Sequence, residues 1–113
     1  MNIELLRGIC KKLPGVTEDI KWENHLCFCV GGKIFIIIGI DEVPVTASFK
    51  VSEEDFDELT AKEGFSQAPY LAKRQWVFID DVNRLSKKEW EQRIKIAYEI
   101  IKSKLPKKVQ QNL

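Results

Sequence analysis

Residues 25–40 read HLCFCVGGKIFIIIGI, and this stretch decides the fold class. Two apolar runs, Leu26–Val30 and Ile34–Ile40, flank the pair Gly31-Gly32. Both central residues of a type I′ hairpin turn need a positive φ, which glycine adopts without a steric penalty. Isoleucine is β-branched and favours strands. The segment therefore predicts a β-hairpin.

Further strand patterns follow along the chain. Val45–Val51 alternates apolar and polar residues, which predicts a strand with one face in the core and the other in water. Residues 75–79 predict another strand, and Lys21-Trp22 a short extended segment before the hairpin. Residues 65–71 contain Pro69 and are expected to be irregular.

Three helices are predicted from capping signals and helical periodicity. Asn2 can cap a first helix that Pro14-Gly15 ends, and Ser52 begins a short helix over about residues 53–63. Ser86 with Glu89 forms a capping-box pattern that begins the longest helix, which Pro106 ends. Its apolar stripe is Trp90, Ile94, Ala97, Ile101 and Leu105.

The order of these elements predicts an α+β fold. Consecutive strands joined by tight turns imply an antiparallel sheet, with the N- and C-terminal helices packed on one of its faces. The 113 residues, 44% hydrophobic and 31% charged, fit one autonomously folding domain over residues 1–113.

Composition also indicates the compartment. The longest apolar run, Ile34–Ile40, is far shorter than the roughly 20 residues that cross a bilayer as a helix, and the first residues do not resemble a secretory signal. The three cysteines are an odd number in a chain that can form a core, which favours reduced thiols. We expect a cytoplasmic protein without a membrane partner.

Charge is distributed unevenly along the chain. Residues 1–83 carry nine Lys/Arg against fourteen Asp/Glu, whereas residues 84–113 carry nine against three. This asymmetry indicates an anionic partner for the C-terminal region, although a solvated helix face would give the same count.

The segment His25-Leu26-Cys27-Phe28-Cys29 is the one cluster with metal-ligand chemistry. On an extended strand its three ligand side chains share a face, but residues two apart are separated by about 6.5–7 Å, too far for adjacent ligands of one zinc ion. His25 is also the only histidine, so any Cys-His or Ser-His catalytic pair would have to use it. The sequence predicts no metal, no cofactor and no enzymatic activity.

Aromatic and basic residues interleave in Pro69–Trp76. Lys73 and Arg74 can neutralise phosphates, and Tyr70 and Trp76 can stack on bases, although Trp76 is at least as suited to the core.

Several of these segments together resemble the MmcQ/YjbR family of small bacterial proteins. The resemblance runs from the first helix to Lys107-Lys108, essentially over the whole chain. The segments that carry it are Leu13-Pro14-Gly15-Val16 followed by Trp22, Val30–Phe35, Ser48-Phe49-Lys50, Pro69–Trp76 and Lys104-Leu105-Pro106-Lys107-Lys108.

The resemblance implies a CyaY-like (frataxin-like) α+β fold and a DNA-binding role, with no catalytic residues. The positions that match the family-like motifs and can contact phosphates are Lys50, Lys73, Arg74, Lys104, Lys107 and Lys108. The alternative is a regulatory domain that binds an anionic small molecule or a peptide in a pocket. Its expected border is Trp22, Tyr70, Lys73, Arg74 and Trp76.

Overall fold

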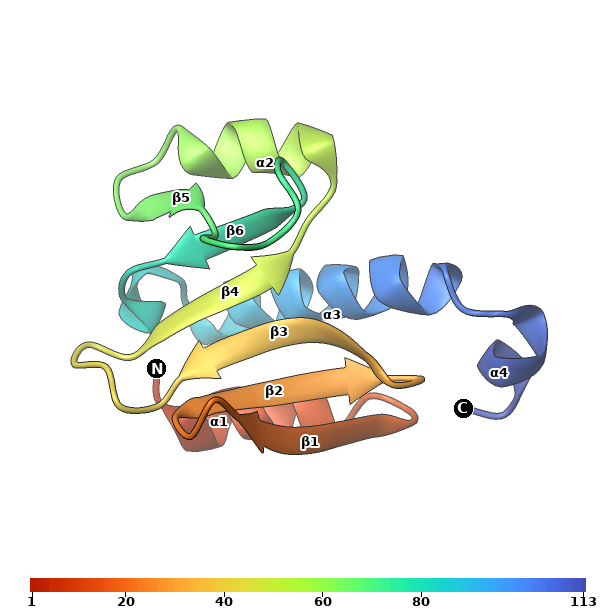
Figure 1. Cartoon of the computed structure of the whole chain (residues 1–113). Coiled ribbons are helices and arrows are strands. Elements are labelled where there is room, and N and C mark those ends of the chain that lie inside the picture. Colours follow the sequence, from red (N-terminus) through yellow and green to blue (C-terminus); the bar gives the residue numbers. More distant parts are fainter.

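The computed structural model describes residues 1–113 as one six-stranded sheet with four α-helices and a 3-10 turn (Figure 1). The strands are β1 (Val16–Lys21), β2 (His25–Val30), β3 (Lys33–Gly39), β4 (Thr46–Lys50), β5 (Phe65–Gln67) and β6 (Trp76–Ile79). The helices are α1 (Ile3–Lys11), α2 (Glu53–Thr60), α3 (Lys87–Ser103) and α4 (Lys107–Gln111), and the 3-10 turn is Val82–Arg84. All neighbouring strands are antiparallel, in the order β1-β2-β3-β4-β6-β5. The predicted α+β class is confirmed.

The predicted hairpin joins β2 to β3. Gly31 and Gly32 have φ values of 56° and 78°, the conformation that the turn requires. The register of the pair shifts between Phe28 and Cys29, so that β3 holds one extra residue at this point. As a result Phe35 reaches the helix side of the sheet, where its ring meets that of Tyr98 edge to face at 5.7 Å between centroids.

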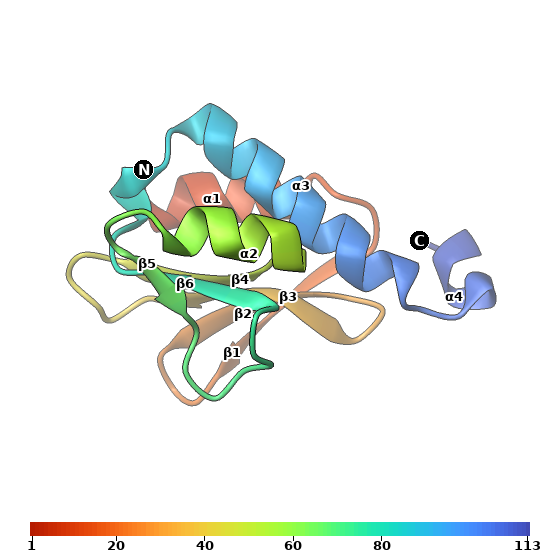
Figure 2. The same ribbon diagram turned by 90° about the horizontal axis from the view of Figure 1, so that it is seen from above.

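The helices cover one face of the sheet, as predicted (Figure 2). The long helix α3 packs on β3 and β4, α1 lies beside α3, and α2 lies over β5 and β6. All five residues of the predicted apolar stripe are buried, although α3 ends at Ser103 and the last of them, Leu105, follows the helix. At its start the Trp90 ring packs against Phe49, and its indole Nε1 donates a 2.8 Å hydrogen bond to the Val82 carbonyl. No helix of the structure is long and apolar enough to span a membrane.

The structure corrects several predicted boundaries. β1 already begins at Val16. It is an edge strand with no fully buried residue, so its sequence carries little apolar signal, and Trp22 lies in the following turn with a φ of 52°. Residues 65–67, expected to be irregular, form β5, a strand too short to show periodicity. The helix expected over residues 53–63 ends at Thr60, and the short helix α4 was not predicted.

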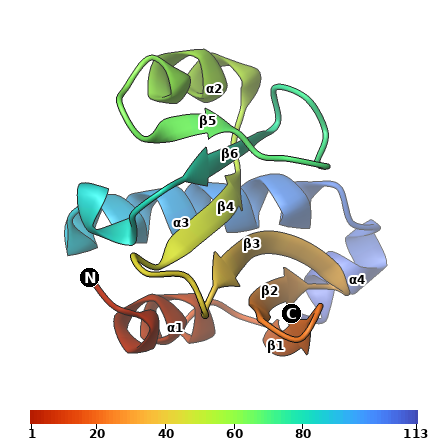
Figure 3. The ribbon, with the colours of Figure 1, turned by 60° about the vertical axis from the view of Figure 1, so that its left-hand side comes forward.

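The two ends of the sheet carry different elements (Figures 1 and 3). The β2–β3 turn, the end of β4, the last turn of α3 and α4 lie at one end, which we call the C-terminal end. The β1–β2 turn, the β3–β4 loop and the start of α3 lie at the other. Leu105 packs directly on Gly31, where an added Cβ would lie only 2.6 Å from Leu105 Cδ1. This contact fixes the end of α3 against the hairpin.

Candidate anion-binding site

Lys50, the last residue of β4, is buried. It was expected on a water-facing side of its strand, but only 4% of it is exposed. β4 lies inside the sheet between β3 and β6, and the cross-strand partner of Lys50 is the large side chain of Trp76. The Lys50 ammonium lies 5.9 Å from the centroid of that ring and donates a 2.5 Å hydrogen bond to Gln75 Oε1. Its contacts are therefore a neutral amide and an aromatic ring.

A second lysine, Lys104, approaches Lys50 from the end of α3. None of the ion pairs in the structure involves Lys50 or Lys104. Burial, together with the neighbouring Lys104 charge, lowers the pKa of Lys50 to about 8. Two cationic side chains thus converge without a carboxylate counter-ion.

The two lysines border a shallow cavity of about 330 Å³ that is open to solvent. Its lining residues are Lys50, Val51, Ser52, Glu53, Gln75, Ile100 and Lys104. Ser52 caps α2 by accepting a hydrogen bond from the Asp55 amide through Oγ, which leaves its hydroxyl proton free to donate. Gln75 accepts through Oε1, which leaves its amide nitrogen free to donate. The cavity therefore offers donors to an anion, with Glu53 as the one opposing charge.

The remaining predicted cations lie outside the cavity. Lys73, Lys107 and Lys108 are exposed and take part in no ion pair. Arg74 is exposed as well, but its guanidinium binds Asp57 on α2 at 2.7 Å. Lys104 belongs to both groups, because it is exposed and also borders the cavity.

The predicted aromatic residues do not come together. Trp76 is 8% exposed and lies beneath Lys50, so stacking on a base would require it to move. Tyr70 is fully exposed in the β5–β6 loop. Trp22 is 65% exposed, but it lies in the β1–β2 turn at the other end of the strands from Trp76, with its ring edge on His25. The structure therefore does not form the pocket border expected for the alternative function.

Sequence reasoning missed Gln75 and Ser52 as parts of the site. Gln75 stands next to the predicted Trp76, and Ser52 had been assigned only a capping role. Their convergence depends on the crossing of β4, β6 and α3, which no local motif encodes.

Cys27 and Cys29 are both buried on β2. Burial raises the pKa of both thiols, to about 11 for Cys27. No three His, Cys, Asp or Glu side chains of the structure lie close enough together to hold a metal ion.

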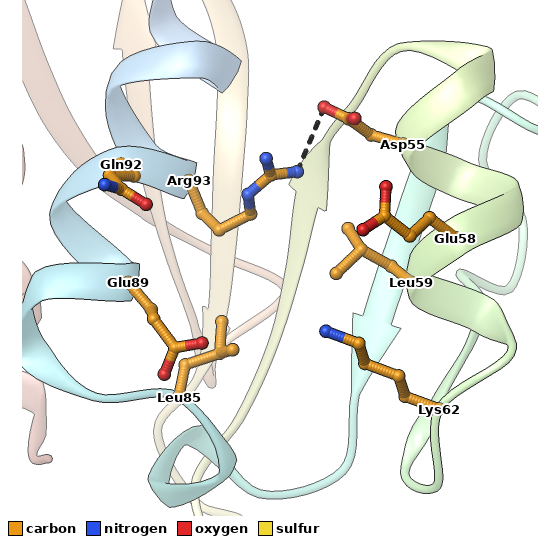
Figure 4. Close-up of a pocket in the computed structure, with 8 residues that line it drawn as sticks. All are labelled: Asp55, Glu58, Leu59, Lys62, Leu85, Glu89, Gln92 and Arg93. Atoms are coloured by element: carbon orange, nitrogen blue, oxygen red, sulfur yellow. Dashed lines mark hydrogen bonds and ion pairs between the residues drawn. The ribbon is translucent and has the colours of Figure 1, made fainter.

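A second cavity lies between α2 and α3 (Figure 4). It has a volume of about 150 Å³ and is lined by Asp55, Glu58, Leu59, Lys62, Leu85, Glu89, Gln92 and Arg93. Arg93 bridges the two helices through a 3.2 Å ion pair with Asp55. Glu89 accepts a hydrogen bond from the Ser86 amide, which lowers the pKa of the Glu89 carboxyl. Arg93, Asp55 and Glu89 are thus matched within the protein, whereas Lys62 and Glu58 form no ion pair.

A third, shallow cavity of about 660 Å³ lies between α1 and β1. Its central polar group is Glu18, which Arg7 binds at 2.7 Å and Lys11 at 2.9 Å. Hydrogen bonds from these two side chains lower the pKa of Glu18 to about 2. Of these three cavities, only the one between Lys50 and Lys104 brings two cations together without an ion pair to either of them.

Comparisons with known proteins agree with the fold. A Deinococcus radiodurans protein, DR2400, described as having a DUF419 domain, superposes with a TM-score of 0.89 at 21% identity, over 98% of this chain and 86% of its own. A Pseudomonas syringae protein superposes with a TM-score of 0.73 at 20% identity, over 89% of this chain and 99% of its own. No curated protein matches the sequence.

These structural similarities show the fold, and the family follows from the sequence. The YjbR family model matches residues 11–100, which is well over half of the chain. The chain therefore belongs to the YjbR family.

Proposed function

We propose that this protein binds DNA through the phosphate backbone and has no catalytic role. The observation that carries the proposal is the row of exposed, unpaired lysines at the C-terminal end, where Lys104, Lys107 and Lys108 follow the last turn of α3 into α4. Lys73, from the β5–β6 loop, adds a fourth unpaired cation outside that row.

Exposed lysines suit the backbone of a nucleic acid. An ammonium on a flexible stem can follow successive phosphates without reading a base, and its contribution depends on the release of counterions. Because nothing in this row provides rigid donors for base edges, we expect binding with little sequence preference.

The test compares two lysine pairs on the same scaffold. Lys107 and Lys108 are the first two residues of α4, and Lys87 and Lys88 are the first two residues of α3 at the opposite end of the protein. All four are exposed. We would measure fluorescence anisotropy of a labelled duplex and a labelled single strand at two salt concentrations. The proteins are the wild type, Lys107→Ala with Lys108→Ala, and Lys87→Ala with Lys88→Ala.

We expect the C-terminal double variant to bind about tenfold more weakly at low salt. Its log-log salt slope should be shallower by about 1.8, since each phosphate contact on duplex DNA contributes about 0.9. The Lys87/Lys88 variant should bind like the wild type. Equal losses in both variants would indicate a general charge effect, and wild-type binding by the C-terminal variant would refute the proposal.

A further inference from the structure

We infer that the cavity between Lys50 and Lys104 is a binding site for one phosphate dianion, carried by free phosphate or by a phosphomonoester. This site shares Lys104 with the exposed lysine row, but it is built around the buried Lys50 and does not depend on binding to the DNA backbone.

The charges of the cavity are the first argument. Lys50 is 4% exposed and has no carboxylate within ion-pair distance, and Lys104 adds a second charge beside it. A buried charge is costly unless it is paired, so a binding partner that supplies negative charge is favoured. A phosphomonoester carries close to two negative charges at neutral pH and matches both lysines, whereas an internal phosphodiester carries one.

The neutral donors are the second argument. The Gln75 amide nitrogen and the Ser52 hydroxyl proton are not used elsewhere in the structure, and both residues line the same cavity. Together with two ammonium groups they provide donors from β4, α3, the start of α2 and the residue before β6. Donors that converge from several elements suit a tetrahedral oxyanion with several acceptor oxygens.

The groups that face Lys50 also determine how binding responds to pH. They are Lys104 from α3, Glu53 from α2, and the neutral Gln75 and Trp76 on the β6 side. In the free protein the pKa of Lys50 is about 8. A bound dianion favours the charged form of Lys50, so binding above pH 8 should take up a proton.

Titration of the full chain with inorganic phosphate tests the inference. We would follow binding by isothermal titration calorimetry, at pH 8.5 in two buffers of different ionisation enthalpy. The proteins are the wild type, Lys50→Met, Lys104→Met and, as the matched control, Lys88→Met, which removes an exposed lysine at the opposite end of α3.

We expect either cavity variant to weaken phosphate binding about tenfold or more, because each removes a charged hydrogen-bond donor. Lys88→Met should change phosphate binding less than twofold, and Glu53→Gln should strengthen it. Lys104 is exposed, so Lys104→Met keeps the test valid even if Lys50→Met fails to fold. Undetectable phosphate binding by the wild type, or an equal loss in Lys88→Met, would overturn the inference.

A second set of ligands identifies the source of the phosphate. A short oligonucleotide with a 5′-phosphate is compared with the same oligonucleotide lacking it and with a mononucleotide. If the 5′-phosphate strengthens binding and this gain disappears in both Lys50→Met and Lys104→Met, the cavity binds nucleic-acid ends. Equal binding of free phosphate and mononucleotide assigns it to small molecules. Binding of the unphosphorylated oligonucleotide reports on the exposed lysine row alone, so the two proposals can fail separately.

Discussion

The two ends of α3 differ in how their polar groups are matched. At the start of the helix, the Ser86 hydroxyl accepts a hydrogen bond from the Glu89 amide at 3.2 Å, and Glu89 Oε1 accepts one from the Ser86 amide at 3.0 Å. One turn further, the Trp90 indole binds the Val82 carbonyl and Arg93 binds Asp55. Ser86, Glu89, Trp90 and Arg93 thus find their partners within the protein, whereas the exposed Lys87 and Lys88 form no ion pair.

At the other end of α3 the charged groups lack such partners. Lys104 approaches the buried Lys50, and Lys107 and Lys108 follow without an ion pair. Internal partners stabilise the start of the helix, whereas the unmatched charges at its end favour an external anion. The difference shows that one helix can hold the fold together at one end and present a binding site at the other.

Trp90→Ala should have the largest effect, because it removes the anchor of the matched end. Trp90 is fully buried against Phe49, and its loss would leave a cavity and remove the indole hydrogen bond to the Val82 carbonyl. We expect the free energy of unfolding to fall by about 3–5 kcal/mol in urea titrations. Trp90→Phe keeps most of the packing, so its smaller loss of unfolding free energy reports the indole hydrogen bond and the lost ring volume. A loss below about 1 kcal/mol in Trp90→Ala would show that this end is not the anchor of the helix.

Lys50→Met should have a smaller effect of the opposite sign. It replaces a buried ammonium that has no counter-ion by an apolar chain of similar length. We expect the free energy of unfolding to rise by about 1–2 kcal/mol at pH 7. The pKa of Lys50 is lowered from 10.5 to about 8 in the folded protein, so between these values the unfolded chain binds more protons. The wild type therefore gains stability relative to Lys50→Met as the pH rises from 8 towards 10.5.

Urea titrations of both proteins at pH 7 and pH 9.5 measure this difference. Subtracting the free energies of unfolding of the two proteins at each pH cancels the pH dependence that comes from the cysteines and tyrosines they share. If the advantage of Lys50→Met is the same at both pH values, the ammonium of Lys50 is not the source of the cost.

The matched end of α3 could be predicted from the sequence, and the unmatched end only in part. The capping box and the apolar stripe are local patterns with a fixed period, so Ser86, Glu89 and the residues from Trp90 to Leu105 were identified correctly. The Gly31-Gly32 hairpin was predictable for the same reason.

The cavity depends on contacts between segments that are distant in the sequence. Lys50 was predicted as a phosphate contact, but its strand pattern gave no sign that the pairing of β4 with β6 would bury it beside Trp76. Trp22 was grouped with Tyr70 by residue type alone, and the strand register separates them. Residue type thus identified candidate side chains, whereas topology decided which of them meet.

The smallest expected effect concerns the stability of the two lysine-pair variants. Each pair occupies the first two positions of a helix, where a positive charge opposes the helix dipole. Replacing either pair by alanine should therefore change the free energy of unfolding by no more than about 0.5 kcal/mol, and in the stabilising direction. Thermal unfolding of both double variants and the wild type under one set of conditions measures this change in stability. A loss above about 1 kcal/mol for Lys107→Ala with Lys108→Ala alone would show that these lysines hold α4 in place. If both double variants are as stable as the wild type but differ in DNA affinity, neither lysine pair is needed for the fold. The lysines at the C-terminal end would then serve to bind DNA.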